Sequence, residues 1–152
     1  MLRTDAVENC YVAGNKTGIV NFEPYSITFT GGSDCYVAKL SPDLSTVSWA
    51  VPTGSSSSTD RLSDLEIDNN GNVYTSGNYQ QSGFFSLSGD FFVEKRSATN
   101  GLLLWQKIYF DGSGTSTDQF LALDPSGQSV YTAASLKHTV LISPGNTLTA
   151  EN

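Results

Sequence analysis

The sequence predicts an all-β protein that consists of about two and a half four-stranded antiparallel units. Three observations lead to this fold class. Sequence blocks recur at a spacing of 56 residues, so that Trp49 returns as Trp105. Short apolar segments alternate with clusters of Gly, Asn, Asp and Ser, which is typical of strands and turns. No window of roughly eleven or more residues shows the periodicity of an amphipathic helix.

Two further blocks have the same spacing of 56 residues. Residues 34–39 (DCYVAK) return at 90–95 (DFFVEK), and residues 65–71 (LEIDNNG) return at 121–127 (LALDPSG). Alignment of the chain on this period predicts one repeat domain over residues 1–152. It comprises a partial unit at 1–61, a full unit at 62–118 and a partial unit at 119–152.

The second unit is expected to be complete. Its strands are predicted at 62–68, 72–78, 90–96 and 102–110. The first unit is expected to lack its first strand and to have the others at 9–15, 34–40 and 46–52. The third unit is expected to have strands at 119–124, 129–135 and 138–143 and then to end.

Turn residues join the first and second strands of the units. Asp68-Asn69-Asn70-Gly71 and Asp124-Pro125-Ser126-Gly127 have Asx first and Gly last, which predicts type I turns with a positive φ at glycine. A calcium loop is the alternative for the first of these segments. We favour the turn, because the glutamate at the twelfth position and the flanking helices of an EF-hand are missing.

The two cysteines are not expected to form a disulfide. Cys10 and Cys35 each begin a predicted strand, and antiparallel pairing places the start of one strand opposite the end of the other. The two sulfur atoms would then lie about 16 Å apart, whereas a disulfide needs Cα atoms within about 7 Å. Metal binding by these cysteines is disfavoured as well, because the chain has no CxxC motif and a single histidine.

Charge and composition narrow the classes of partner. The net charge of −7 argues against binding to nucleic acid and to anionic lipid, and leaves cation binding open. Residues after Met1 form neither a signal peptide nor a membrane span. Only 15% of residues are charged, and Ser, Thr and Asn make up much of the polar surface. This composition predicts an extracellular or cell-surface protein, with an ordinary cytosolic β domain as the alternative.

The segment from Lys16 to Ser33 is the longest connection and carries Phe22, Tyr25, Ile27 and Phe29. Loops that vary in length between repeats are the usual place for binding residues. The four hydrophobic side chains are therefore candidates for an interaction surface. Alternation within residues 25–29 equally predicts a small additional hairpin, so both interpretations stay open.

Four-stranded units of this length pack around a central axis in β-propellers. Trp49 and Trp105 recur on the last strand of their units, which predicts packing between neighbouring blades; stacking on a carbohydrate is the alternative. Two and a half blades do not close a ring, since propellers need about four to eight. We therefore expect an assembly with other copies of the chain or with other subunits, including a filament held by contacts between strand edges.

Several segments resemble a known repeat family. Residues 11–14 (YVAG), 34–43 (DCYVAKLSPD), 47–50 (VSWA) and 65–74 (LEIDNNGNVY) are similar to the SBBP-type β-propeller repeat of bacterial proteins. The resemblance extends over residues 9 to 143 and implies propeller blades. The chain departs from the pattern at Leu44, where the family has Gly, at the charged Glu94-Lys95-Arg96, and at Ala134.

A second resemblance is shorter. Residues 98–105 (ATNGLLLW) look like a block of the quinoprotein, or PQQ-type, propeller repeat. In that family the tryptophan docks neighbouring blades, and the enzymes also need a calcium site and residues that stack on the cofactor. Neither can be located in this sequence, so the resemblance supports the fold rather than an activity.

No residue is predicted to be catalytic, and no cofactor or metal site is predicted. His138 is the single histidine and has no nucleophile pattern beside it. Asp60, Asp64 and Glu66 are a weak candidate for a carboxylate pair, and Asp64 and Glu66 are expected on one face of a strand. Asn15 begins an N-glycosylation sequon.

The sequence thus favours a non-enzymatic scaffold or interaction module. The alternatives are a fragment of a propeller enzyme, either quinoprotein-like or hydrolytic, and a carbohydrate-binding propeller.

Overall fold

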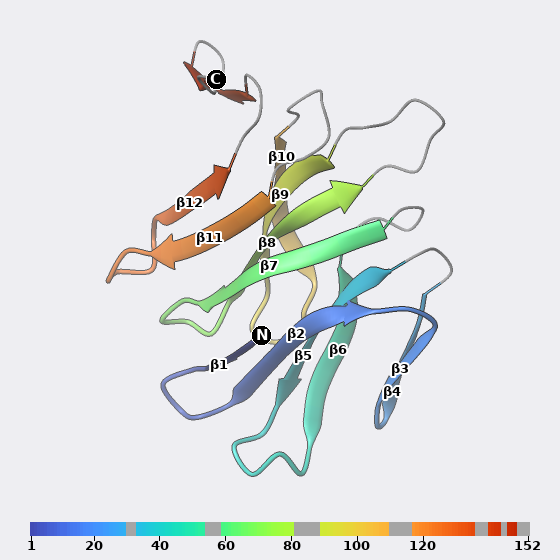
Figure 1. The fold of residues 1–152 in the computed structure, drawn as a ribbon. Coiled ribbons are helices and arrows are strands. Elements are labelled where there is room, and N and C mark those ends of the chain that lie inside the picture. The colour runs from blue at the N-terminus through green and yellow to red at the C-terminus, as the bar shows by residue number, and fades with distance from the viewer. Residues whose placement is uncertain are drawn as a thin grey trace.

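The computed structural model describes residues 1–29, 33–53, 59–80, 89–109, 117–135, 140–143 and 146–148. All regular secondary structure in these ranges is β-strand, and every strand pair is antiparallel. The predicted all-β, antiparallel fold class is confirmed. Figure 1 shows the two four-stranded sheets and, next to the second of them, one of the three two-stranded hairpins, stacked in chain order. These ranges contain no helix that is long and apolar enough to cross a membrane.

The first sheet corrects one prediction. Its strand order is β1-β2-β5-β6, with β1 at Leu2–Thr4, β2 at Cys10–Lys16, β5 at Asp34–Leu40 and β6 at Val47–Thr53. The expectation that the first unit lacks its first strand is wrong, because β1 pairs with β2 from Leu2↔Val12 to Thr4↔Cys10. β1 has only three residues, all of them exposed. Three residues are too few to show an alternation of apolar and polar residues in the sequence.

The second sheet agrees with the predicted complete unit. Its strand order is β10-β9-β8-β7, with β7 at Thr59–Ile67, β8 at Val73–Gln80, β9 at Gly89–Arg96 and β10 at Leu103–Tyr109. All four strands lie where the 56-residue period places them. The largest boundary shift is at the start of β7, which begins at Thr59 rather than Leu62.

The third unit is a hairpin in the described residues. It is made by β11 (Thr117–Leu123) and β12 (Val130–Ser135), which correspond to the first two predicted strands. Of the third predicted strand, β13 covers Val140–Ser143, whereas His138 lies outside the described residues. β13 pairs with β14 (Asn146–Leu148), and β12 pairs with β11 alone among the described strands.

The long connection of the first unit contains a separate hairpin. β3 (Ile19–Phe22) and β4 (Tyr25–Thr28) pair with each other, as the hairpin interpretation predicted. The chain turns between them at a cis peptide bond between Glu23 and Pro24.

Two hydrophobic clusters hold the layers together. The first lies between the two four-stranded sheets and includes Tyr11, Ala13, Cys35, Val37 and Trp49 from one side and Leu62, Leu65, Val73 and Phe92 from the other. The second joins the opposite face of the second sheet to the β11–β12 hairpin and includes Tyr74, Val93, Leu121, Trp105 and Val130. The second sheet is therefore covered on both faces, which explains the continuous apolar run at residues 91–93.

The predicted turns are confirmed. Gly71 and Gly127 have φ angles of 77° and 70°, and each donates its N–H to the carbonyl of the aspartate three residues earlier, at 2.8 Å in both turns. The first unit has the same turn after Asp5, where Glu8 takes the glycine position with a φ of 65°. The sequence did not reveal this third example because it lacks the glycine.

The register of β2 and β5 keeps the cysteines apart. Cys10 lies opposite Leu40, and Cys35 lies opposite Asn15. The two residues are thus at opposite ends of the ladder, as predicted, and both are free and buried. Burial raises the pKa of the Cys35 thiol to about 12, so this thiol is protonated at neutral pH.

We predict that replacing Leu44 by glycine stabilises the protein. Leu44 has a φ of 60° in the turn between β5 and β6, and its side chain is exposed. Relief of left-handed strain, reduced by the greater entropy of unfolded glycine, should raise the free energy of unfolding by about 1 kcal/mol. Urea denaturation measures this change. Leu44→Ala removes the same exposed side chain without relieving the strain, so an equal gain in that control would contradict the explanation.

Candidate functional site

Four side chains form the same arrangement in both sheets. An aspartate in the turn, a tyrosine on the second strand, a lysine on the third and a tryptophan on the fourth make up each set. The first set is Asp5, Tyr11, Lys39 and Trp49, and the second is Asp68, Tyr74, Lys95 and Trp105. We call each set a tyrosine cluster.

The geometry of the two tyrosine clusters is nearly identical. The tyrosine and tryptophan rings meet edge to face, with centroids 6.2 Å apart in the first cluster and 6.0 Å in the second. The lysine Nζ lies 5.1 Å and 4.8 Å above the centre of the tyrosine ring, respectively. The same lysine faces the aspartate Oδ2, at 3.8 Å and 3.1 Å. These clusters combine cation–π, aromatic and ionic contacts on one face of each sheet.

The aspartate of each cluster is fixed by its own turn. Burial by itself would raise the pKa of Asp68, but hydrogen bonds from Asn72, Lys95 and Asn70 outweigh it and lower the pKa. Its Oδ1 accepts the backbone N–H groups of Asn70 and Asn72 at 2.9 Å and 2.8 Å. The oxygens of Asp68 are thus engaged within the turn, which agrees with the turn interpretation of this segment over the calcium loop.

The first tyrosine cluster also joins the two sheets. The Trp49 indole N–H donates to the carbonyl of Ala98 at 3.1 Å, and the Tyr11 hydroxyl donates to the carbonyl of Gly71 at 3.1 Å. Gly101 lies against the Trp49 ring, where a Cβ atom would approach to 2.7 Å. Trp49 therefore lies between two layers, the location that the sequence suggested for it.

A polar cluster lies buried in the same interface. Glu94 on β9 is fully buried and accepts hydrogen bonds from Arg96 Nε at 2.7 Å and from Thr75 Oγ1 at 2.9 Å. Thr53 Oγ1 reaches the same carboxylate from the first sheet. Arg96 also donates to the carbonyl of Gly101 at 3.0 Å. Glu94 and Arg96 thus neutralise each other inside the protein, whereas Lys95 pairs with Asp68.

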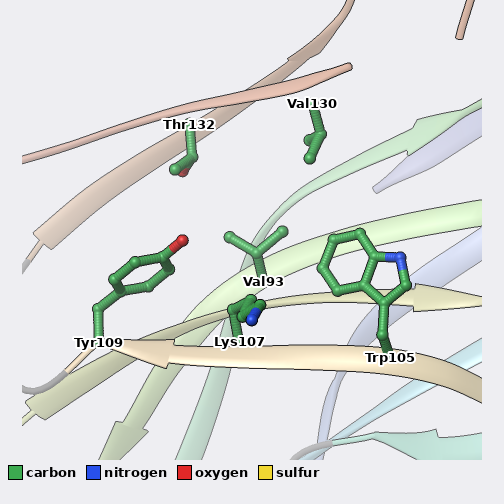
Figure 2. A pocket seen from close by; sticks show the side chains of 6 residues that line it. All are labelled: Val93, Trp105, Lys107, Tyr109, Val130 and Thr132. Carbon is green, nitrogen blue, oxygen red and sulfur yellow. The ribbon is translucent and has the colours of Figure 1, made fainter. Parts of the chain in front are cut away.

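We call the contact between the two four-stranded sheets the first interface, and the contact between the second sheet and the β11–β12 hairpin the second interface. The second interface contains an open groove. It has a volume of about 360 Å³ and is lined by Val93, Trp105, Lys107, Tyr109, Val130 and Thr132. Figure 2 shows Trp105, Lys107 and Tyr109 on β10 facing Val130 and Thr132 on β12. The corresponding residues of the first interface include Val37, Trp49, Thr53, Val73 and Thr75, which are all buried. The groove is the candidate functional site, because it is open where its counterpart is filled.

The aromatic connection of the first unit faces its own sheet. The Phe22 ring lies 5.3 Å from the Tyr36 ring, and the Tyr25 hydroxyl donates to the carbonyl of Ser48 at 2.7 Å. Ile27 and Phe29 are buried. Phe22 and Tyr25 are half-buried, so none of the four side chains in the candidate interaction surface is exposed.

The carboxylates of β7 have structural contacts. Arg3 approaches Asp64 and Glu66, with N···O distances of 3.5 Å and 3.1 Å, so the two share one face of β7 as expected. The other oxygen of Asp64 accepts the backbone N–H of Leu121 at 2.8 Å. Asp60 is buried. The first contacts attach β1 to β7, and the Leu121 contact attaches β11 to β7.

The remaining candidates have separate outcomes. Asn15 Nδ2 is the atom that an N-linked glycan would modify, and it donates to the Asp60 carbonyl at 2.7 Å and to Cys35 Sγ at 3.2 Å. His138 lies outside the described residues. Among the described residues, no three His, Cys, Asp or Glu side chains are grouped so that they could hold a metal ion.

We predict different costs for two aspartates in equivalent turns. Asp68→Ala removes a buried acceptor of several hydrogen bonds and should lower the free energy of unfolding by about 1–3 kcal/mol. Asp124→Ala removes the acceptor of the Ser129 N–H from a solvent-accessible turn, where water can replace the lost hydrogen bond, and should lower the free energy of unfolding by less than Asp68→Ala does.

The cost at Asp68 should also depend on pH. The pKa of Asp68 is lowered on folding, so its contribution is complete well above the ordinary value of 3.8 and declines as the pH falls through the lower folded value. Urea denaturation at several pH values measures this dependence. If the difference in the free energy of unfolding between the wild type and Asp68→Ala increases as the pH falls, the pKa of Asp68 is not lowered on folding.

The Glu94–Arg96 pair predicts a strongly non-additive cycle. Arg96→Leu alone leaves a buried carboxylate without its cation and should destabilise the protein by about 3–5 kcal/mol. Glu94→Leu combined with Arg96→Leu removes both charges and should cost less than Arg96→Leu alone. Equilibrium unfolding of the single and double variants tests this, and additive costs would exclude a coupled pair.

Comparison of the sequence with protein families and with curated proteins gives no match. The stacked sheets, their exposed faces and the groove are the features of the molecule that bear on its function.

Proposed function

We propose that the chain is a non-enzymatic structural scaffold whose sheets are blades of a β-propeller-type repeat and stack on further copies of the same chain. One observation carries this proposal. Tyr131 on β12 is 62% exposed, whereas the equivalent Tyr74 on β8 is 4% exposed because the next layer covers it. The face of the β11–β12 hairpin that carries Tyr131 is thus exposed, whereas the equivalent face of the second sheet, which carries Tyr74, is buried.

The outer face of the β11–β12 hairpin is apolar. Strand register puts Tyr131 opposite Ala122, and Ala133 opposite Phe120. The Phe120 side chain is 62% exposed as well. Large exposed apolar side chains that lie together on a sheet face are typical of a surface that binds another protein.

The first sheet has a second apolar face at the other end of the stack, where Leu2 is exposed, Val12 and Ala50 are half-buried and Ala38 is buried. Leu2, Val12, Ala38 and Ala50 lie side by side across its four strands. Leu2 is 60% exposed, whereas Leu65, its equivalent on β7, is buried against the first sheet. Phe22 contacts Tyr36 on the same face and leaves the Leu2 end open.

These two end faces are complementary in the way that internal layers are. A face with Tyr11 or Tyr74 always packs against the next layer, so the Tyr131 face of one copy fits the Leu2 face of another. Such a contact is heterologous and continues into a ring or a filament. Blades of a β-propeller stack face to face around an axis, which is the packing proposed here, and the resemblance to SBBP repeats supports it as well.

The surroundings of the acidic groups support a non-enzymatic role. Asp5, Asp64, Asp68 and Glu94 are engaged with cations or backbone N–H groups. The low charge content and the Ser, Thr and Asn surface support an extracellular or cell-surface location.

Sedimentation velocity over a range of protein concentrations, at physiological salt, tests the stacking. We expect the wild-type mass to rise with concentration, and Leu2→Asp or Tyr131→Asp to abolish the rise by placing a charge on one end face. Each variant keeps the other face intact. A mixture of the two variants should therefore form dimers and nothing longer.

Val7→Asp is the control, because Val7 is exposed in the turn between β1 and β2 rather than on either end face. It should associate like the wild type. A wild-type chain that stays monomeric at all concentrations, or variants that do not pair on mixing, would overturn the proposal.

A further inference from the structure

We propose that the groove between β10 and β12 binds an extended peptide strand that carries a carboxylate, and that this strand pairs with the edge of β12 that no described strand occupies. The groove lies on the inner face of β12, opposite the face that carries Tyr131, so its side-chain lining does not depend on the stacking of copies. The inference rests on a comparison of the two interfaces within this chain.

In the first interface, β9 occupies the space that is open in the second. β9 pairs with β8 and turns Phe92, Glu94 and Arg96 towards the first sheet. The equivalent of β8 in the third layer is β12, since Val130 and Thr132 take the places of Val73 and Thr75. Among the described strands, β12 has β11 as its single partner, so its other edge is open to a strand in the position of β9.

In the first interface β9 places the Glu94 side chain at the position that corresponds to the groove. The Glu94 carboxylate bridges the hydroxyl groups of Thr53 and Thr75. Tyr109 and Thr132 stand at the equivalent positions and line the groove. A carboxylate at the Glu94 position of an added strand would therefore lie between two hydroxyl groups.

The groove differs from its counterpart by one charge. Lys107 on β10 replaces Val51 on β6, and its side chain lines the groove beside Val93 (Figure 2). In the first interface, Arg96 neutralises the carboxylate from within β9. In the second, Lys107 supplies a cation from the wall of the groove, which favours an acidic strand over a neutral one. Trp105 and Val130 provide the apolar surface beside it.

A peptide with the sequence of residues 90–97 (DFFVEKRS) is the direct probe, because the chain already accepts this strand in the first interface. We expect calorimetric titration of the full chain to show binding, and the peptide with Gln in place of the Glu94 equivalent to bind at least tenfold more weakly. Lys107→Val introduces the residue that stands at the equivalent position of the first interface. In this variant the affinities of the two peptides should differ by no more than about threefold. Lys107 is exposed, and an unchanged circular dichroism spectrum confirms that this variant folds.

The location is tested by amide chemical shifts on peptide addition. The site predicts changes along 130–135 on β12 and at the Trp105 indole, with little change at β1 and β6, the open edges of the first sheet. Failure of the acidic peptide to bind, equal binding of both peptides to the wild type, or shifts confined to another edge would each overturn the proposal. These outcomes leave the stacking of copies untouched, because that is measured without peptide.

Discussion

The contact of Trp49 with the Ser97–Gly101 turn is the constraint on which the stacking of layers depends. A flat aromatic ring can lie under a backbone turn only if the turn has no side chain there, and Gly101 meets this need with a φ of 71°. The indole N–H then finds its acceptor in the same turn, at the Ala98 carbonyl. Apolar burial and hydrogen-bond satisfaction are thus achieved by one side chain. The contact fixes the second sheet over the first.

The two tyrosine clusters have the same geometry although their residues recur at two different spacings. Trp49 and Trp105, like Lys39 and Lys95, are 56 residues apart, whereas Tyr11 and Tyr74 are 63 apart. The clusters nevertheless have the same geometry. Extra residues in the connection between the second and third strands of the first unit are placed outside the sheet, partly in the β3–β4 hairpin. The contacts between the sheets require the tyrosine cluster, but they do not constrain the length of this connection.

The two interfaces of the second sheet differ in how polar groups are satisfied. In the first, Glu94 and Arg96 neutralise each other within one strand, so the interface can close completely. A buried pair of this kind contributes little net stability but is costly to break. In the second, Lys107 faces the groove without an equivalent strand beside β12 in the described residues. The same repeat therefore produces one filled interface and one open one.

The sequence by itself determined the all-β class, the strands of the second sheet, the glycine turns and the separation of the cysteines. These follow from local periodicity, turn residues and strand spacing, which act over a few residues. Only the tertiary structure showed β1, the turn at Glu8 and the pairing of Glu94 with its surroundings. β1 is too short to show a period, and Glu8 carries a side chain in a left-handed conformation that sequence rules assign to glycine. The environment of Glu94 comes from β6, β8 and β10, so it exists only after the sheets have stacked.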